Sequence, residues 1–248
     1  MAKITLDFSQ FKPGLYLREY YNHVGRENRE ILNFLHRAYL NIFSQISNAS
    51  VLELGGGPTV YQLISLAKYS VSINFTDFSA SNLTEIQKWI NAQSDAFPWK
   101  KFIRYVLKAE GVSGSSKNIA RRENSIRAKI KKIFQLDIRH LPEKRKQYDL
   151  ISSHFMAESI TDNHNEWKSA LQNLTAFIKP GGYLISSIIL SASLYHVGRR
   201  RFSAVPIQES EVIFQLTNLN LSILDTHFVQ AESNQGYSGI FMVLAKKI

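Results

Sequence analysis

The feature that most constrains the fold is residues 51–59, VLELGGGPT. The short, mainly apolar run from Val51 to Leu54 is typical of a buried parallel strand, and three glycines follow it directly. Because glycine has no Cβ, such a strand can turn sharply and bring its backbone against a ligand. We expect a helix to begin near Thr59, a good N-cap residue, and to continue through Ala67. Strand, glycine turn and helix predict the nucleotide-binding corner of a doubly wound α/β sheet.

The glycine turn departs from the dinucleotide-binding pattern in two places. Gly55 and Gly57 match the first two glycines of G-x-G-x-x-G, but Val60 replaces the third and Pro58 removes a backbone N–H. Pyrophosphate needs N–H donors at the start of the helix. We therefore favour a ligand with an adenosine and no phosphate, of which S-adenosylmethionine (SAM) is the common one. The alternative is a glycine-rich turn that binds no ligand.

Two aspartates follow the next two predicted strands. Residues 71–77 alternate apolar and polar side chains and end in Asp77, which lies 22 residues beyond Gly55. That spacing is close to the roughly 20 residues at which a carboxylate meets the hydroxyls of a ribose. Asp137 ends a third predicted strand, residues 132–138, at the same sheet edge, where it can accept from an adenine amino group while Ile138 packs on the ring. Either aspartate can instead cap the following helix or loop.

Length and composition are typical of one α/β domain. The chain has 248 residues with 44% hydrophobic and 20% charged side chains, no cysteine, and no apolar run long enough to span a membrane. The absence of cysteine excludes disulfides and thiolate metal sites, and we expect no metal centre and a cytoplasmic protein.

The net charge of +10 is concentrated in residues 121–132, 144–146 and 199–201. We favour solvated faces over a nucleic-acid site, because no recognised nucleic-acid module accompanies the charge.

The remaining pattern predicts elements on both sides of this corner. Residues 8–21 are rich in aromatics and form either a lid over a ligand or a packing arm, and residues 26–46 form an amphipathic helix. Residues 92–116 are expected to be irregular, followed by a basic helix from Ile119 to Ile133. A polar loop with three arginines follows the strand that ends at Leu190. The last two strands, 222–229 and 238–245, form an antiparallel hairpin through a turn at 233–236.

Together these segments resemble the nicotinamide, phenylethanolamine and indolethylamine N-methyltransferase family. The resemblance rests on GGGPTVYQL at 55–63, TDFSASNL at 76–83, LKAEG at 107–111, IKPGGYL at 178–184 and SLYHVGRRRF at 193–202, together with the tyrosines of YLREYY at 16–21. It implies a Rossmann-like, seven-stranded, mostly parallel sheet with an N-terminal helical lid. It also implies SAM as methyl donor, S-adenosylhomocysteine (SAH) as product, and a small amine or pyridine as acceptor. We expect one domain over 1–248, with lid and cap helices in 1–46 and the SAM-binding core in 50–248.

The resemblance also assigns cofactor contacts, to which the glycine turn adds Gly57. By position these are Tyr16, Tyr21, Gly55, Gly56, Thr59, Tyr61, Asp77, Asn82, Asp137, Ile138 and Ser153. The acceptor side differs from the family pattern. Two positions that commonly carry acids hold Ile188 and Ala157, and Glu158 follows one residue later. Because one residue turns a helix by about 100°, Glu158 need not substitute for the lost acid.

The sequence thus predicts a SAM-dependent N-methyltransferase (EC 2.1.1 class) of a small amine, an amino-acid-like compound or an N-heterocycle. We expect a monomer. The residues that can orient or deprotonate the acceptor are His154, Glu158, Tyr195, His196 and Tyr237, although each can be structural. Without the acids, Arg199 to Arg201 can hold a carboxylate on an anionic acceptor. The alternatives are O-methylation of a small acid, methylation of RNA through the basic surface, and cofactor binding without turnover.

Overall fold

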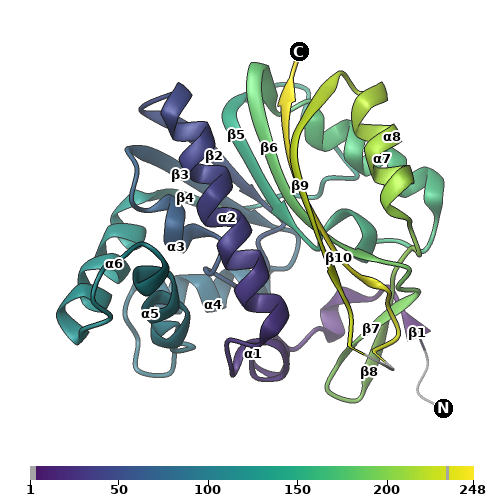
Figure 1. The fold of residues 1–248 in the computed structure, drawn as a ribbon. Coiled ribbons are helices and arrows are strands. Elements are labelled where there is room, and N and C mark those ends of the chain that lie inside the picture. The colour runs from purple at the N-terminus through teal and green to yellow at the C-terminus, as the bar shows by residue number, and fades with distance from the viewer. Residues whose placement is uncertain (1–3, 233–234) are drawn as a thin grey trace.

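The computed structural model describes residues 4–232 and 235–248 and has a central seven-stranded sheet (Figure 1). The strand order is β4-β3-β2-β5-β6-β10-β9. The five strands from β4 to β6 are parallel, and β10 runs antiparallel to both β6 and β9. The strands are β2 (Ala49–Leu54), β3 (Val71–Asp77), β4 (Ile130–Gln135), β5 (Tyr148–His154), β6 (Ile178–Leu190), β9 (Leu221–Gln230) and β10 (Gly239–Lys247).

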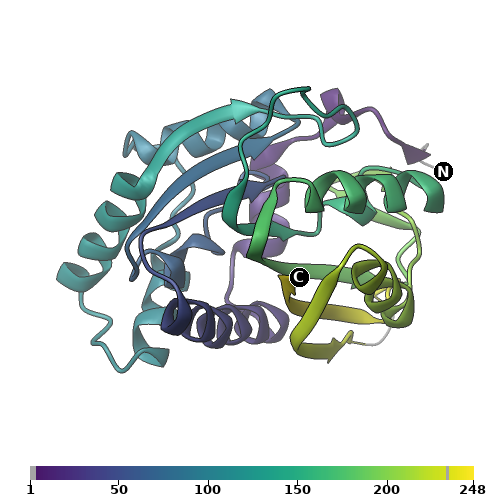
Figure 2. The ribbon, with the colours of Figure 1, turned by 90° about the horizontal axis from the view of Figure 1, so that it is seen from above.

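Helices cover both faces of this sheet (Figure 2). On β2, Val51 joins the core formed with α2 to α6, whereas Leu52 and Leu54 join the core formed with α7 and α8. This alternation is what a strand buried on both faces requires. The helices are α2 (Arg26–Gln45), α3 (Leu63–Leu66), α4 (Ala80–Ile90), α5 (Lys100–Ala109), α6 (Ser116–Lys129), α7 (His164–Thr175) and α8 (Glu209–Asn218). The predicted doubly wound fold and the antiparallel hairpin are confirmed, although residues 233–234 of the predicted turn lie outside the described residues.

The chain order creates a crevice beside β2. From β2 the chain moves outward through β3 and β4, and then returns to the other side of β2 to form β5 and β6. Ligands of open α/β sheets bind at this point, outside the carboxyl ends of the strands. The glycine turn after β2 and the segments after β3, β5 and β6 therefore share one edge.

Three predicted segments differ from the structure. The helix expected from Thr59 is only α3, because the Thr59 hydroxyl and the Gln62 amide donate to Gly56 O and hold residues 59–62 in a turn. Residues 92–116 are not irregular: they contain α5, whose residues Phe102, Ile103, Val106 and Leu107 are buried at helical spacing. The basic helix ends at Lys129, and Ile130 begins β4, whose last residue precedes Asp137 by two positions.

The loop with three arginines is also ordered, and it joins the N-terminus. Strands β7 (Leu194–Val197) and β8 (Arg200–Ser203) form a hairpin, and β1 (Ile4–Thr5) pairs with β8. Next to this small sheet lie the 3-10 turn η1 (Phe8–Gln10) and helix α1 (Pro13–Tyr21). We call β1, η1, α1, β7 and β8 the cap; Figure 1 shows it at one end of the main sheet.

The cap is held together around Phe202, which is fully buried. The rings of Phe8 and Tyr195 stack on it with centroids 5.9 and 5.4 Å away, and Phe11 meets its edge at 5.7 Å. Tyr20 also donates to the carbonyl of His196 at 2.9 Å. The N-terminal segment and the β7–β8 hairpin therefore share one hydrophobic cluster.

Several of the basic side chains on α6 serve the packing of this region. Arg122 pairs with Glu110 and donates to Ile64 O at 2.7 Å, and Lys129 donates to Tyr69 O. The Arg127 guanidinium lies over the Trp89 ring, 4.5 Å from its centroid. These contacts account for part of the positive charge without a nucleic-acid partner.

Among the described residues, no helix is long and apolar enough to cross a membrane, and no three His, Asp or Glu side chains are grouped to hold a metal ion.

Candidate functional site

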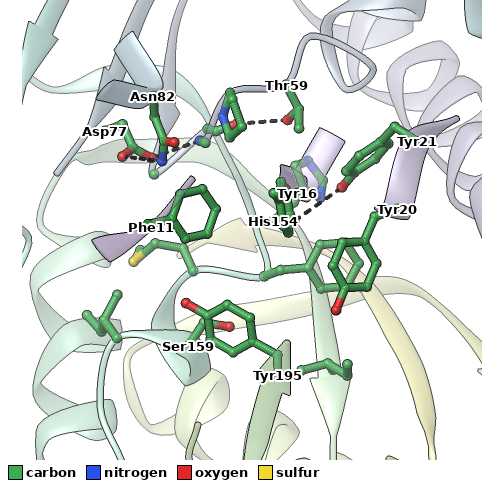
Figure 3. Close-up of a pocket in the computed structure, with 18 of the residues that line it drawn as sticks. Phe11, Tyr16, Tyr20, Tyr21, Thr59, Asp77, Asn82, His154, Ser159 and Tyr195 are labelled. Carbon is green, nitrogen blue, oxygen red and sulfur yellow. Dashed lines mark hydrogen bonds between the residues drawn. The ribbon is translucent and has the colours of Figure 1, made fainter. Parts of the chain in front are cut away.

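A cavity of about 910 Å³ lies at the carboxyl edge of the parallel strands (Figure 3). One half is lined by the segments that follow β2, β3 and β4, including Gly55 to Thr59, Asp77 and Asp137. The other half is lined by α1, the start of α2, and the segments after β6 and β9. The cap forms part of its wall through Phe8, Phe11, Tyr16 and Tyr195. We call these two halves the cofactor end and the acceptor end.

The three glycines of the turn differ in backbone conformation and in the space around them. Gly55 and Gly57 have φ angles of +63° and +61°, in the left-handed region that favours glycine. A Cβ on Gly55 would also stand 2.2 Å from Cγ of Met156, and one on Gly56 would stand 2.4 Å from Cζ of Phe75. Beside Gly57 there is open space. Buried side chains therefore pack closely against Gly55 and Gly56, whereas the space beside Gly57 is open to the cavity.

Buried polar groups lie beneath this turn. Gln62 donates to Glu53 Oε1 at 3.1 Å as well as to Gly56 O, and Thr59 donates to the same carbonyl at 2.8 Å. Glu53 is fully buried, and burial raises the pKa of this carboxyl to about 8, although hydrogen bonding opposes the shift. Glu53 is therefore mostly protonated at neutral pH. The Thr59 hydroxyl is engaged within the turn while the residue lines the cavity.

Asp77 lies at the centre of the cofactor end. Its Oδ1 accepts from Ser79 N and from Asn82 Nδ2, and its Oδ2 accepts from Gly57 N at 2.8 Å. Burial raises the pKa of Asp77 above its ordinary value, while these three donors act in the opposite direction. Figure 3 shows Asp77 and Asn82 side by side at the cavity wall.

The remaining acceptor capacity of this pair fits a ribose. A carboxylate has about four lone-pair positions, so three donors leave one open on Asp77. Asn82 Oδ1 is buried and has no hydrogen-bond partner among the described residues. An orphaned buried oxygen is costly unless a ligand satisfies it. Two neighbouring acceptors match two vicinal hydroxyls, so the residues present fit the adenosine part of SAM.

Asp137 and Ile138 lie farther along the same end of the cavity. Ile138 is buried, and Asp137 accepts from the backbone N–H and guanidinium of Arg139, with 2.8 Å between Oδ2 and Nη2. Partial burial acts to raise the pKa of Asp137, but Arg139 more than offsets it, and the pKa lies below its ordinary value. The Arg139 guanidinium also lies 4.9 Å from the centroid of Phe78. Asp137 is thus an ionised, Arg-paired carboxylate beside an apolar wall.

Three tyrosines, two from α1 and one from the segment between β2 and α3, meet beside the glycine turn. The Tyr21 ring stacks on Tyr61 at 5.3 Å, and the hydroxyls of Tyr16 and Tyr21 are 3.5 Å apart. Burial raises the pKa of all three phenols well above the ordinary value, so they stay neutral. They supply a water-excluding wall whose hydroxyls can donate or accept hydrogen bonds.

The predicted acceptor-side residues separate into two groups. His154, Tyr195, His196 and Tyr237 line the cavity, whereas Glu158 does not; Ser153, which was predicted as a cofactor contact, does not line it either. Ser153 donates to Leu54 O, and Glu158 is buried on the other side of β6, where it accepts from Ile189 N at 2.9 Å. Burial raises the pKa of Glu158 to about 7. Both residues fasten strands rather than face the cavity.

His154 lines the cavity but is held on both sides. Its Nδ1 is 2.9 Å from Ser187 Oγ and its Nε2 is 3.1 Å from Ser152 Oγ. Burial lowers the pKa of His154 to about 3. A neutral imidazole with both nitrogens engaged serves as a rigid floor and has no free nitrogen for a proton from the acceptor.

The arginine hypothesis is not supported by the geometry. None of Arg199, Arg200 and Arg201 lines the cavity, and Arg200 contacts Gln10 within the cap. Ile188, at one of the two positions where the sequence resemblance implied an acid, is buried in the core formed with α7 and α8.

Sequence reasoning missed other residues that line the cavity. Arg139 and Phe78 directly follow residues that were predicted to contact the cofactor. Their positions in the sequence, next to the segments of Asp137 and Asp77, could therefore have identified them. Met156 carries no such signal, because only its packing on Gly55 reveals it. Glu19, Arg26, Glu27 and Asn28 belong to α1 and α2, and they line the acceptor end.

Comparisons with known proteins agree with this geometry. NodS, an N-methyltransferase from Bradyrhizobium japonicum WM9, matches with a TM-score of 0.55 and 17% identity over 88% of this chain and 95% of that structure. Magnesium protoporphyrin IX methyltransferase from Synechocystis PCC 6803, solved with bound SAM, matches with a TM-score of 0.56 and 14% identity, covering 97% of this chain and 93% of that structure. The fold is that of the SAM-dependent methyltransferases.

The sequence comparisons narrow this class. The model of the NNMT/PNMT/TEMT family matches residues 2–248, and the chain belongs to this family. Phenylethanolamine N-methyltransferase of Macaca mulatta is 28% identical over all of this chain and 92% of the relative. Human nicotinamide N-methyltransferase is 28% identical over 97% of this chain and 94% of the relative. The resemblance seen in the sequence is confirmed, as is the predicted class of SAM-dependent N-methyltransferase.

The Asp77 site generates a first prediction. Replacing Asp77→Ala should weaken SAH binding at least about tenfold, because lost charge-assisted hydrogen bonds are worth about 1.5–3 kcal/mol. Titration calorimetry measures the effect, and circular dichroism checks the fold. Asp162→Ala, an exposed aspartate outside the cavity lining, is the matched control. Equal SAH affinities for the two variants would contradict the ribose assignment.

Glu53 generates a second prediction, on stability. A carboxyl with a pKa of about 8 when folded, against 4.5 ordinarily, stabilises the fold at low pH and loses that effect as pH rises toward 8. The unfolding free energy of the wild type should therefore fall between pH 6.5 and pH 8, by at most about 1.4 kcal/mol per pH unit for this group. Glu53→Gln, which cannot titrate, should flatten the slope in urea denaturation. An unchanged slope, matching that of the exposed Glu143→Gln control, would contradict the assignment.

Proposed function

We propose that this chain transfers a methyl group from SAM to a nitrogen atom of a small-molecule acceptor. The observation that carries the proposal is one continuous cavity. Its cofactor end presents Asp77 and Asn82, and its acceptor end is walled by the cap. The names of the relatives, which include phenylethanolamine and nicotinamide N-methyltransferases, support nitrogen over oxygen as the methylated atom.

The residues present support this chemistry by holding and enclosing the reactants. When bound, SAM supplies an electrophilic methyl group: the nitrogen lone pair forms the new bond while the carbon–sulfur bond breaks and its electron pair stays on sulfur. Asp77, Asn82 and the glycine turn would hold the adenosine, and Tyr16, Tyr21 and Tyr61 would exclude water. Such positioning is worth several kcal/mol of the barrier, because the reacting atoms must be about 3–3.5 Å apart and in line.

No residue at the acceptor end is required as a strong base. A neutral pyridine nitrogen attacks directly, and an amine reacts from its unprotonated fraction, releasing the proton to solvent. The engaged nitrogens of His154 and the position of Glu158 outside the cavity support this view. The proposal therefore rests on proximity and orientation.

A mass-spectrometric screen tests the proposal. The chain is incubated with SAM carrying a deuterated methyl group and with a panel of small amines, N-heterocycles and carboxylic acids. The expected result is a labelled N-methyl product and SAH. In a parallel incubation with RNA, transfer of the label to RNA at a rate that falls steeply with salt would instead favour the RNA alternative. Labelled esters would favour O-methylation, and SAH binding without any product would favour a protein that only binds the cofactor.

We also propose that the cap opens and closes as one body over the cavity, which extends the predicted lid of residues 8–21. Hydrogen exchange should show that SAH protects amides in residues 8–21 and in residues 194–203 to a similar degree, because both pack on Phe202. Helix α8, which does not line the cavity, is the internal control. Equal exchange with and without SAH would make the cap a fixed packing arm.

The predicted single domain, monomeric state and cytoplasmic location stay predictions.

A further inference from the structure

The acceptor end carries an uneven distribution of charge. Three carboxylates line it, from Glu19 on α1, Glu27 on α2 and Glu232 after β9, and the one arginine that lines it, among the described residues, is Arg26. Glu19 accepts from Gly198 N at 3.0 Å and is exposed, and Glu232 is also exposed. This half of the cavity therefore attracts a cation rather than an anion.

Glu27 is distinguished from the other two carboxylates by its setting. It is half-buried and lies in the first turn of α2, where the helix dipole stabilises a negative charge. Tyr237, in the segment between β9 and β10, donates to Glu27 Oε1 at 2.6 Å. Burial, followed by the neighbouring Glu27, raises the pKa of the Tyr237 phenol, which therefore remains a donor. One donor leaves most of the acceptor capacity of the carboxylate open.

Aromatic rings surround the same space. Tyr20 and Tyr195 line the acceptor end, and Asn28 donates to Tyr20 O at 3.2 Å, which places the start of α2 beside α1. In Figure 3 the rings of Tyr16, Tyr20 and Tyr195 face the cavity. Aromatic faces attract organic cations and pack against flat apolar groups. A carboxylate beside such rings is suited to a protonated amine attached to an aromatic or apolar group.

On the basis of the proposed function, we propose that Glu27, positioned by Tyr237, is the residue that selects the acceptor, a small amine that is an ammonium ion in solution. The ammonium binds to the carboxylate and the attached group packs between the tyrosines. The amine then loses a proton to solvent before its nitrogen attacks.

A binding experiment tests this assignment independently of turnover. The protein is saturated with SAH, and calorimetry measures the affinities of 2-phenylethylammonium, its neutral isostere 2-phenylethanol, and the anion phenylacetate. We expect the ammonium to bind at least about tenfold more tightly than the other two. Glu27→Gln should remove that preference and leave the affinity for 2-phenylethanol and for SAH unchanged, because only the charge is lost.

Glu30→Gln is the matched control. Glu30 lies one turn farther along α2 and pairs with His227, but it does not line the cavity, so its replacement should leave all three affinities unchanged. Tyr237→Phe should lower the affinity for the ammonium less than Glu27→Gln does. If the anion or the alcohol binds most tightly, if none of the probes binds, or if Glu27→Gln and Glu30→Gln behave alike, the assignment is wrong. A wild type that fails to bind SAH would instead refute the proposed function.

Discussion

The hydrogen bond from Gly57 N to Asp77 Oδ2 is the interaction on which the site depends. It joins the turn after β2 to the end of β3, and so fixes the position of both relative to the cavity. Gly55 and Gly56 allow this geometry because Met156 and Phe75 occupy the space that a Cβ would need. The same aspartate accepts from Asn82 Nδ2, while the amide oxygen Oδ1 of Asn82 has no hydrogen-bond partner among the described residues. One carboxylate thereby organises the turn, the strand end and the first residues of α4.

The acceptor end is built by different means. The cofactor end consists of strand ends in one sheet, whereas the acceptor end gathers α1, α2, β7 and the segment between β9 and β10. Its closure depends on the aromatic cluster around Phe202 and on single hydrogen bonds such as Tyr237 to Glu27. This division suits an enzyme family that keeps one cofactor and varies its acceptor.

Local sequence patterns indicated which segments line one half of the cavity, at the strand ends, but not which segments line the other half, and the reason is physical. Gly55, Asp77 and Asn82 follow strands whose apolar patterns are clear, and parallel strands bring their ends to one edge. Helix α5 was missed because its apolar residues are interspersed with four basic residues, which made the buried apolar face hard to recognise; these are Lys100, Lys101, Arg104 and Lys108. The pairing of Ile4 with Arg201 and of Tyr237 with Glu27 joins residues about 200 apart, and no local signal specifies such contacts. Ser153 and Glu158 were assigned by position along the chain, yet their side chains point away from the cavity.

A crystal structure of the complex with SAH tests the central claim most directly. The account predicts the ribose hydroxyls within hydrogen-bond distance of Asp77 Oδ2 and Asn82 Oδ1, with the adenine beside Ile138. It also predicts that the Gly57 N to Asp77 bond is retained, because the site is formed before the ligand binds. A ribose that contacts neither side chain, or a glycine turn that rearranges and breaks this bond, would contradict the account.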